Sequence, residues 1–133
     1  MSDAGIPERV RNFLQRDIDS IEQLEVLLLL RSRPEQSFSP VEVSRILGST
    51  VTSIQERLDR LAGAQLLVQD VLDSTATYRY APATEEARDL VDGIGEAYKV
   101  RRLTVINLIY GKPERDLRSF SDAFKLTRKK DGG

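Results

Sequence analysis

The chain has 133 residues, enough for one compact domain with terminal additions and too few for two ordinary domains. It contains no Cys and no His, which excludes disulfides, thiol and imidazole nucleophiles and the commonest zinc ligands. We therefore expect neither an enzyme nor a cofactor. Hydrophobic residues make up 40% and charged residues 31% of the chain, as in an ordinary folded protein.

The net charge of −1 is unevenly distributed along the chain. Residues 1–100 hold 11 Lys and Arg against 17 Asp and Glu, whereas residues 101–133 hold 9 against 4. A basic end on an acidic body can bind nucleic acid, an anionic membrane or an acidic protein, and it can also serve self-association. No apolar run approaches the roughly 20 residues that would span a bilayer, and no signal-peptide pattern is visible, so we expect a cytoplasmic protein.

The first predicted element is a short amphipathic helix over residues 6–17, with Pro7 in its first turn. A second helix is predicted over residues 19–32, with Asp19 as its N-cap and Glu22 completing a capping box. Residues 26–30 are apolar around the whole helix circumference, which favours a central helix covered on several sides.

Two more helices and a hairpin are predicted next. Ser39 as N-cap, Pro40 at the first helical position and Glu42 begin a helix that ends near Gly48. Thr50 can cap the following helix, which continues to about residue 65 with an apolar stripe formed by Ile54, Leu58, Leu61 and Ala62. Residues 66–72 and 76–81 alternate between polar and apolar side chains and predict a β-hairpin.

A long helix is predicted within residues 83–112, beginning after Thr84 and carrying an apolar stripe as far as Tyr110. Gly93 and Gly95 interrupt it, and each costs about 1 kcal/mol inside a helix. They indicate either a bend or a place where another helix approaches closely.

Residues 113–133 form a basic segment in which the apolar side chains of Leu117, Phe120 and Phe124 fall at helical spacing. Three interpretations compete. The segment packs on the body and frays at its end, docks on an acidic protein or an anionic membrane surface, or binds phosphate as an arm. In the docking interpretation those three apolar residues are the partner-binding site.

The order helix, short strand at residues 36–38, helix, helix and hairpin predicts a mainly helical fold with a small β-hairpin, the winged helix-turn-helix. The central part of this fold covers residues 36–82, and the whole winged-helix unit covers residues 19–82. An N-terminal helix within residues 1–18 precedes it, and the C-terminal segments described above follow it. Residues 43–61 resemble, without a gap, the helix-turn-helix of bacterial regulators of the MarR type. The counterparts of the family pattern are Leu47, Gly48, Thr50, Ile54, Leu58, Asp59, Arg60 and Leu61, followed by Gln65, Leu66 and Leu67. Ser49 and Gln65 depart from the usual residues, so no subfamily is specified.

This resemblance implies a transcriptional regulator that binds double-stranded DNA with the second helix, about residues 50–65, in the major groove. The expected contacts to bases and phosphates come from Thr50, Val51, Thr52, Ser53, Gln55, Arg57 and Arg60 on that helix and from Arg79 on the hairpin. The terminal helices are expected to form a homodimer, because a two-fold dimer matches a palindromic operator.

Acidic residues on the same surfaces favour an alternative. Glu56 and Asp59 lie on the predicted recognition helix, and Asp70 and Asp73 flank the hairpin turn. Residues 19–82 hold 6 Lys and Arg against 9 Asp and Glu, so the basic surface expected of a duplex binder is missing. Glu56 and Arg60 are spaced for an exposed ion pair. The alternative function is therefore a winged-helix module for protein–protein interaction with little or no DNA binding.

Overall fold

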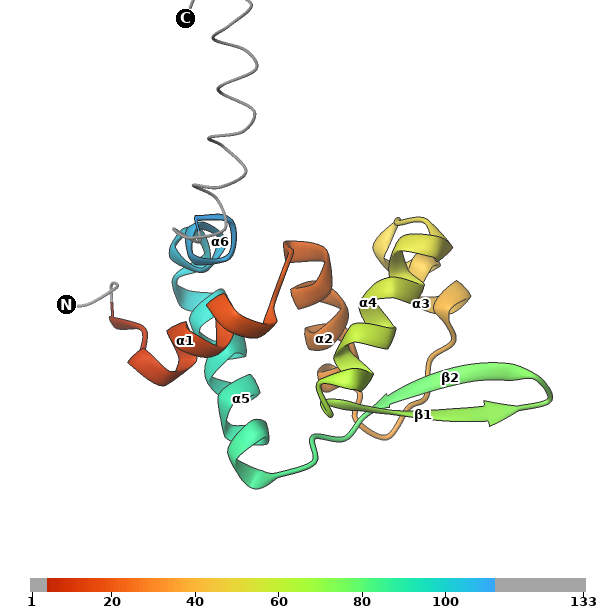
Figure 1. The fold of residues 1–133 in the computed structure, drawn as a ribbon. Helices are drawn as coiled ribbons and strands as arrows, with labels where there is room; N and C mark the ends of the chain where they lie inside the picture. The colour runs from red at the N-terminus through yellow and green to blue at the C-terminus, as the bar shows by residue number, and fades with distance from the viewer. Residues whose placement is uncertain (1–4, 112–133) are drawn as a thin grey trace, which may run out of the picture.

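The computed structural model describes residues 5–111. In chain order the elements are α1 (Glu8–Asp17), α2 (Ile21–Ser32), α3 (Pro40–Leu47), α4 (Val51–Gly63), β1 (Leu67–Leu72), β2 (Thr75–Tyr80), α5 (Glu85–Val100) and α6 (Arg102–Tyr110). Figure 1 shows α1, α5 and α6 on one side of the molecule and α3, α4 and the hairpin on the other, with α2 between them. The predicted fold class, a mainly helical winged helix-turn-helix with extra terminal helices, is confirmed.

Helix α2 is the centre of the core. Leu24, Val26, Leu27 and Leu30 are fully buried, and Leu28 and Leu29 are half-buried. The helix packs against α4 and β2. Its apolar run has no solvent face because neighbours cover it from more than one direction, as the sequence predicted.

The helix-turn-helix is fixed by local hydrogen bonds that the sequence predicted. The Ser39 hydroxyl accepts from the amide of Glu42 at 3.1 Å, and the Glu42 carboxylate accepts from the amide of Ser39 at 2.8 Å, which completes a capping box. Gly48 ends α3 with φ of +75°, a left-handed conformation that favours glycine. The Thr50 hydroxyl then caps α4 by accepting from the amide of Ser53 at 3.2 Å.

The wing is a two-stranded antiparallel hairpin in which Leu72 pairs with Thr75. Asp73 and Ser74 form the turn with φ of 53° and 66°, which matches the right-handed twist of the strands. At the base, Phe38 and Tyr78 exchange two backbone hydrogen bonds of 2.8 Å, so the predicted short strand at residues 36–38 is present as a bridge to β2. The wing is thereby anchored to the chain that leads into α3.

The start of α2 differs from the prediction by one residue. Ser20, not Asp19, is the N-cap, and its hydroxyl accepts from the amide of Gln23 at 3.0 Å. The Gln23 side chain in turn accepts from the amide of Asp19 at 2.9 Å, where a capping-box partner would lie. The Asp19 carboxylate pairs with Arg60 of α4 instead. Because Asp19 is engaged in this ion pair, the hydroxyl of the next residue, Ser20, caps the helix.

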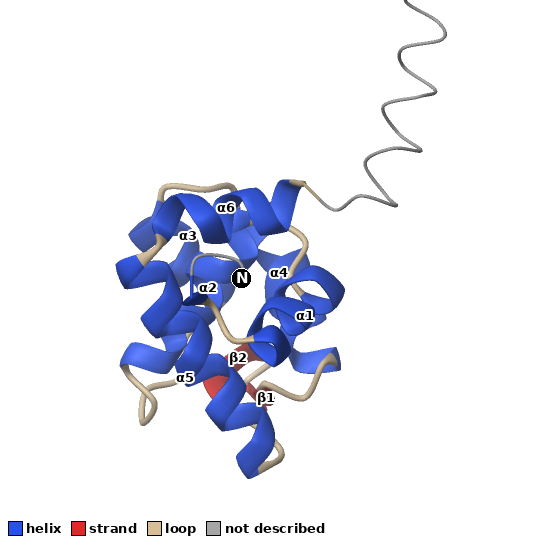
Figure 2. Ribbon diagram, turned by 90° about the vertical axis from the view of Figure 1, so that its left-hand side faces the viewer, coloured by secondary structure: helices blue, strands red, loops and turns tan. Residues whose placement is uncertain are grey.

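The predicted single helix over 83–112 is wrong, because the structure has two helices separated at Arg101. This residue adopts φ of −128° and ψ of 58°, and α6 folds back against α1 and α5. The buried stripe of α5, at Val91, Ile94 and Ala97, would continue at Arg101 in a straight helix and bury its guanidinium. The break leaves Arg101 exposed. In the turned view α6 crosses the molecule at the end opposite the hairpin (Figure 2).

Gly93 and Gly95 lie within α5 and mark close approaches, the second of the two predicted alternatives. A Cβ atom on Gly93 would lie 2.8 Å from Cγ2 of Val10, a buried side chain of α1. A Cβ atom on Gly95 would meet the Arg31 guanidinium, also at 2.8 Å.

We expect Gly93→Ala to destabilise the protein by about 1–2 kcal/mol, since the buried, β-branched Val10 cannot move aside and overpacking outweighs the helix-propensity gain. Gly95→Ala is the matched control, because the guanidinium is the end of a flexible side chain. It should be neutral or stabilise by up to about 1 kcal/mol. Urea unfolding of both variants measures the difference, and equal free energies would refute the close α1–α5 contact.

None of the helices within residues 5–111 is long and apolar enough to cross a membrane.

Candidate nucleic-acid interface

Helix α4 presents three faces. Its buried stripe, Ile54, Leu58 and Leu61, belongs to the core. A polar stripe, formed by Ser53, Arg57 and Arg60, contacts Asp19 and Glu22 at the start of α2. The remaining face points away from the body and includes Val51, Thr52 and Glu56, which are all exposed. The third face is therefore the most open to a macromolecule.

The first turn of α4 is exposed, as a helix that reads a DNA groove would require. Thr50 caps the helix, and Val51 is 42% exposed. Thr52 follows it on the same exposed surface. The first amides of a helix lack partners within the helix and carry partial positive charge, which suits a phosphate or a base acceptor. Thr50, Val51 and Thr52 are therefore brought together where DNA contacts were predicted.

Glu22 of α2 accepts hydrogen bonds from Ser53 and Arg57, two other residues that were predicted to contact DNA. Its Oε1 atom accepts from Nε of Arg57 at 2.9 Å and from the hydroxyl of Ser53. Both side chains of the ion pair are largely covered, with exposed fractions of 23% for Arg57 and 24% for Glu22. Ser53 and Arg57 thus serve the α2–α4 contact in this structure and do not face a ligand.

Arg60 is also paired within the molecule. Its Nη1 atom donates to the carboxylate of Asp19, and its side chain remains 63% exposed. The ion pair that the sequence predicted, between Glu56 and Arg60, is replaced by this one. The reason is that Asp19 lies at the start of α2, within reach of the α4 face that also carries Arg57.

The Glu22 contact is linked to pH. Burial raises the pKa of the Glu22 carboxyl, but hydrogen bonds from Ser49 and Ser53 and the Arg57 guanidinium outweigh burial, so that the pKa is lowered. A lowered folded-state pKa contributes stability that is present above the unfolded-state value of 4.5 and is lost as pH falls through the folded-state pKa.

We accordingly expect Glu22→Gln to lower the free energy of unfolding by about 1–2 kcal/mol at pH 7, because it removes charge-assisted hydrogen bonds. The deficit should shrink once pH falls below 4.5 toward the folded-state pKa. Denaturant unfolding between pH 7 and 3 measures both effects. Glu56→Gln, on the exposed face of the same helix, should change stability by less than about 0.5 kcal/mol. A pH-independent Glu22→Gln deficit would contradict the linkage.

Tyr78 of the wing joins α4 to the hairpin. Its ring is fully buried, and its hydroxyl donates to the Asp59 carboxylate at 2.6 Å. The same oxygen accepts from the side-chain amides of Gln55 at 2.8 Å and Gln69 at 3.1 Å. The donor and both acceptor positions of the hydroxyl are therefore filled. This set of four side chains, the Tyr78 cluster, ties α4 to the wing.

The cluster changes the interpretation of two predicted residues. Asp59 was expected as an acid that repels phosphate, but it accepts hydrogen bonds from Tyr78 and from Gln55 at 3.2 Å. Gln55, expected to contact DNA, has its amide nitrogen bound to both Asp59 and Tyr78. Neither Tyr78 nor Gln69 was predicted as a site residue. The available signal was an alternating strand with a tyrosine on its buried side.

The tip of the wing is apolar and acidic. Val71 and Leu72 are 69% and 71% exposed, between Asp70 and Asp73, which are also exposed. Arg79 lies opposite Val68 in the hairpin and is half-buried, so it is set back from the tip. The wing therefore lacks the cationic tip that usually enters a minor groove. The predicted partner-binding residues Leu117, Phe120 and Phe124 lie outside the described residues.

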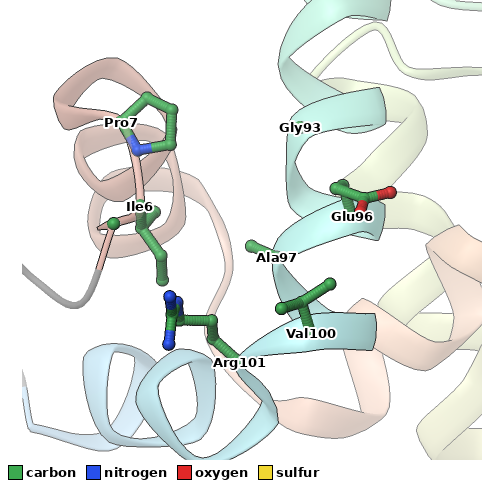
Figure 3. A pocket seen from close by; sticks show the side chains of 8 residues that line it. Ile6, Pro7, Gly93, Glu96, Ala97, Val100 and Arg101 are labelled. Atoms are coloured by element: carbon green, nitrogen blue, oxygen red, sulfur yellow. The ribbon is translucent and has the colours of Figure 1, made fainter.

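A cavity of about 300 Å³ opens between the segment before α1 and the second half of α5. Figure 3 shows Ile6 and Pro7 on one side and Ala97, Val100 and Arg101 on the other, with Glu96 at the edge. The lining side chains come from the terminal elements, so this cavity is separate from the exposed face of α4.

The helix-turn-helix, the hairpin wing and the framing terminal helices together define a winged helix-turn-helix fold. No protein-family model and no curated protein matches the chain.

Solved structures do match, at low sequence identity. MepR from Staphylococcus aureus, a transcription regulator of a multidrug efflux pump, has 14% identity and a TM-score of 0.54, covering 92% of this chain and 87% of its own. A mutant of MarR from Escherichia coli has 14% identity and a TM-score of 0.53, with coverage of 90% and 85%. A MepR mutant bound to an oligodeoxyribonucleotide has 12% identity and a TM-score of 0.50, with coverage of 91% and 89%. The predicted resemblance is thus confirmed at the level of the fold.

Proposed function

We propose that this protein is a DNA-binding transcriptional regulator that acts in the cytoplasm and inserts the first turn of α4 into the major groove. The observation that carries the proposal is the exposed surface formed by Thr50, Val51 and Thr52 on the second helix of a helix-turn-helix. Threonine hydroxyls can bond bases or phosphates, and valine can contact a thymine methyl group. The likeness of the fold to MepR, a mutant of which is bound to an oligodeoxyribonucleotide, supports the proposal.

The test is retardation of genomic DNA fragments by the purified protein at low salt, followed by titration with salt. The proposal expects retardation of some fragments and a steep loss of affinity as salt rises, because contacts to phosphate release counterions. Absence of retardation at low salt would overturn it.

A second candidate function is protein–protein interaction through the same face. Two features of this face favour it. Arg57 and Arg60 are already paired with acidic residues near the start of α2, and the tip of the wing is apolar and acidic. Glu56→Gln separates the two candidates. If DNA approaches this face, removing the exposed acid should raise affinity severalfold. If the face serves a protein partner alone, the variant should acquire no affinity for DNA.

We further propose that the terminal helices form a homodimer. Val100, Leu103 and Tyr110 of α5 and α6 are 60%, 75% and 52% exposed, an apolar surface that a second copy would cover. Sedimentation equilibrium measures the state directly. A monomer at concentrations of tens of micromolar would refute dimerisation.

A further inference from the structure

Arg60 lies near the end of α4, at the border between the exposed face and the polar stripe of this helix. It follows Glu56, a residue of the exposed face, by four positions, so the two side chains leave the helix on neighbouring sides. Thr52, in the first turn, lies eight positions earlier, a separation of about 12 Å along the helix. Because the major groove is about 12 Å wide, the phosphates that border a groove read by the first turn lie within reach of the Arg60 side chain.

Asp19 binds Arg60 with the chemistry that a phosphate would use. Its carboxylate accepts a hydrogen bond from Nη1 of Arg60, and carboxylates and phosphates present the same kind of anionic oxygen to a guanidinium. The Arg60 side chain is 63% exposed, and an ion pair with so exposed a partner contributes little to stability. Arg60 can therefore exchange one anion for another at small cost. Arg57 lacks this freedom, because its side chain and that of Glu22 are both largely covered.

We propose that Arg60 is a binding site for a phosphate of the DNA backbone, and that the Asp19 carboxylate occupies this site in the free protein as an internal competitor; this inference rests on the proposed function. When a duplex docks on α4, a phosphate takes the place of the carboxylate. A contact to phosphate carries no sequence information, so Asp19 lowers the affinity for every duplex by a similar factor.

The contrary arrangement is an Asp19 side chain that orients Arg60 toward the phosphate and stays paired with it in the complex. The two arrangements predict opposite signs. Removing the carboxylate strengthens DNA binding if Asp19 competes with phosphate, and it weakens DNA binding if Asp19 positions Arg60.

The experiment is a double-mutant cycle on the 133-residue chain, with Asp19→Asn, Arg60→Gln and the two combined. Asparagine keeps the size of the side chain, and the Asp19 amide that donates to Gln23 at the start of α2 is unchanged. Asp19→Ser is a second variant that lacks the carboxylate. Fluorescence anisotropy with a labelled duplex from a retarded genomic fragment, near 0.1 M salt, measures the affinity. Thermal unfolding checks that each variant is folded.

The matched control is Asp92→Asn. It removes one acid from another ion pair between helices, that of Arg31 on α2 with Asp92 on α5. Helix α5 lies on the opposite side of α2 from α4 (Figure 1), so the arginine released by this change is remote from the docked duplex. The control therefore measures the effect of one lost negative charge alone.

Asp19→Asn and Asp19→Ser should each bind the duplex about 3- to 10-fold more tightly than the unmodified protein. Asp19→Asn in the Arg60→Gln background, and the Asp92→Asn control, should each change the affinity by less than about twofold. Unchanged or weaker binding by Asp19→Asn, an equal gain in the control, or a gain that persists without Arg60 would each overturn the inference while leaving the proposed function standing. If neither the unmodified protein nor Asp19→Asn binds duplex at low salt, the proposed function fails and this inference fails with it.

Discussion

Replacing Tyr78 by alanine should lower the free energy of unfolding by about 3–5 kcal/mol, the largest effect expected of a single substitution outside the α2 core. Its ring is fully buried, its backbone bridges to Phe38, and its hydroxyl is bonded to Asp59, Gln55 and Gln69. The substitution removes the packing of the wing against α4 together with the polar contacts. Denaturant unfolding measures the loss.

Tyr78→Phe removes the hydroxyl and keeps the ring, so it tests the hydrogen bonds alone. It should lower the free energy of unfolding by about 1–2 kcal/mol, because three hydrogen bonds are lost. Tyr80 is the matched control. It lies two residues further along β2, is 5% exposed, and its hydroxyl has no hydrogen-bond partner within residues 5–111. Tyr80→Phe should therefore be neutral or slightly stabilising. Equal effects of the two substitutions would contradict the role assigned to the Tyr78 cluster.

The effect of Tyr78→Phe on stability should depend on pH in the alkaline range. Burial raises the pKa of the Tyr78 phenol above its ordinary value of 10.0, and the nearby Asp59 carboxylate raises the pKa further. A raised folded-state pKa contributes stability that is complete below the unfolded-state value and is lost as pH rises through the folded-state pKa. The difference in free energy of unfolding between the unmodified protein and Tyr78→Phe should therefore become smaller above pH 10.

Replacing Thr52 by glutamate should weaken DNA binding by about 1–3 kcal/mol, which is about 5- to 150-fold in affinity, while leaving the fold intact. Thr52 is exposed in the first turn of α4, so the new carboxylate meets the phosphates of a docked duplex. The same carboxylate is favourable for the helix, because acids near a helix N-terminus interact well with its dipole.

Anisotropy titration and thermal unfolding of this variant separate binding from stability. Asn12→Glu, which adds the same charge at an exposed position of α1, is the control. It should bind DNA nearly as well as the unmodified protein. Unchanged affinity in Thr52→Glu would show that the first turn of α4 does not face DNA.

Local signals predicted much of the fold. The caps at Ser39, Thr50 and Thr84 were correct because each depends on a hydrogen bond to an amide three residues away. The burial of α2 followed from an apolar run with no polar face, and the hairpin followed from the alternation of polar and apolar side chains. In these cases nearby residues determine the structure.

Contacts between residues far apart in the sequence could not be predicted. Arg57 and Arg60 are predicted DNA contacts, and in the structure they pair with acids 35 and 41 residues earlier in the chain. Spacing along one helix suggested a Glu56–Arg60 pair and could not show that Asp19 lies nearer. Similarly, the break at Arg101 depends on α6 packing against α1, a contact between the two ends of the described chain. Sequence periodicity identifies a helical face, and only the tertiary structure shows what that face meets.

The central claim is that the first turn of α4 binds DNA. Selection of bound sequences from random duplex DNA tests this claim most directly. The 133-residue chain is incubated with a random-sequence pool at low salt, and bound duplexes are recovered and amplified over several rounds. The affinity for the enriched sequence is then measured as salt is raised. We predict enrichment of a defined sequence, with an affinity that Thr52→Glu reduces and that falls steeply with salt. A pool that stays random, with no duplex retained at about 0.05 M salt, would contradict the account.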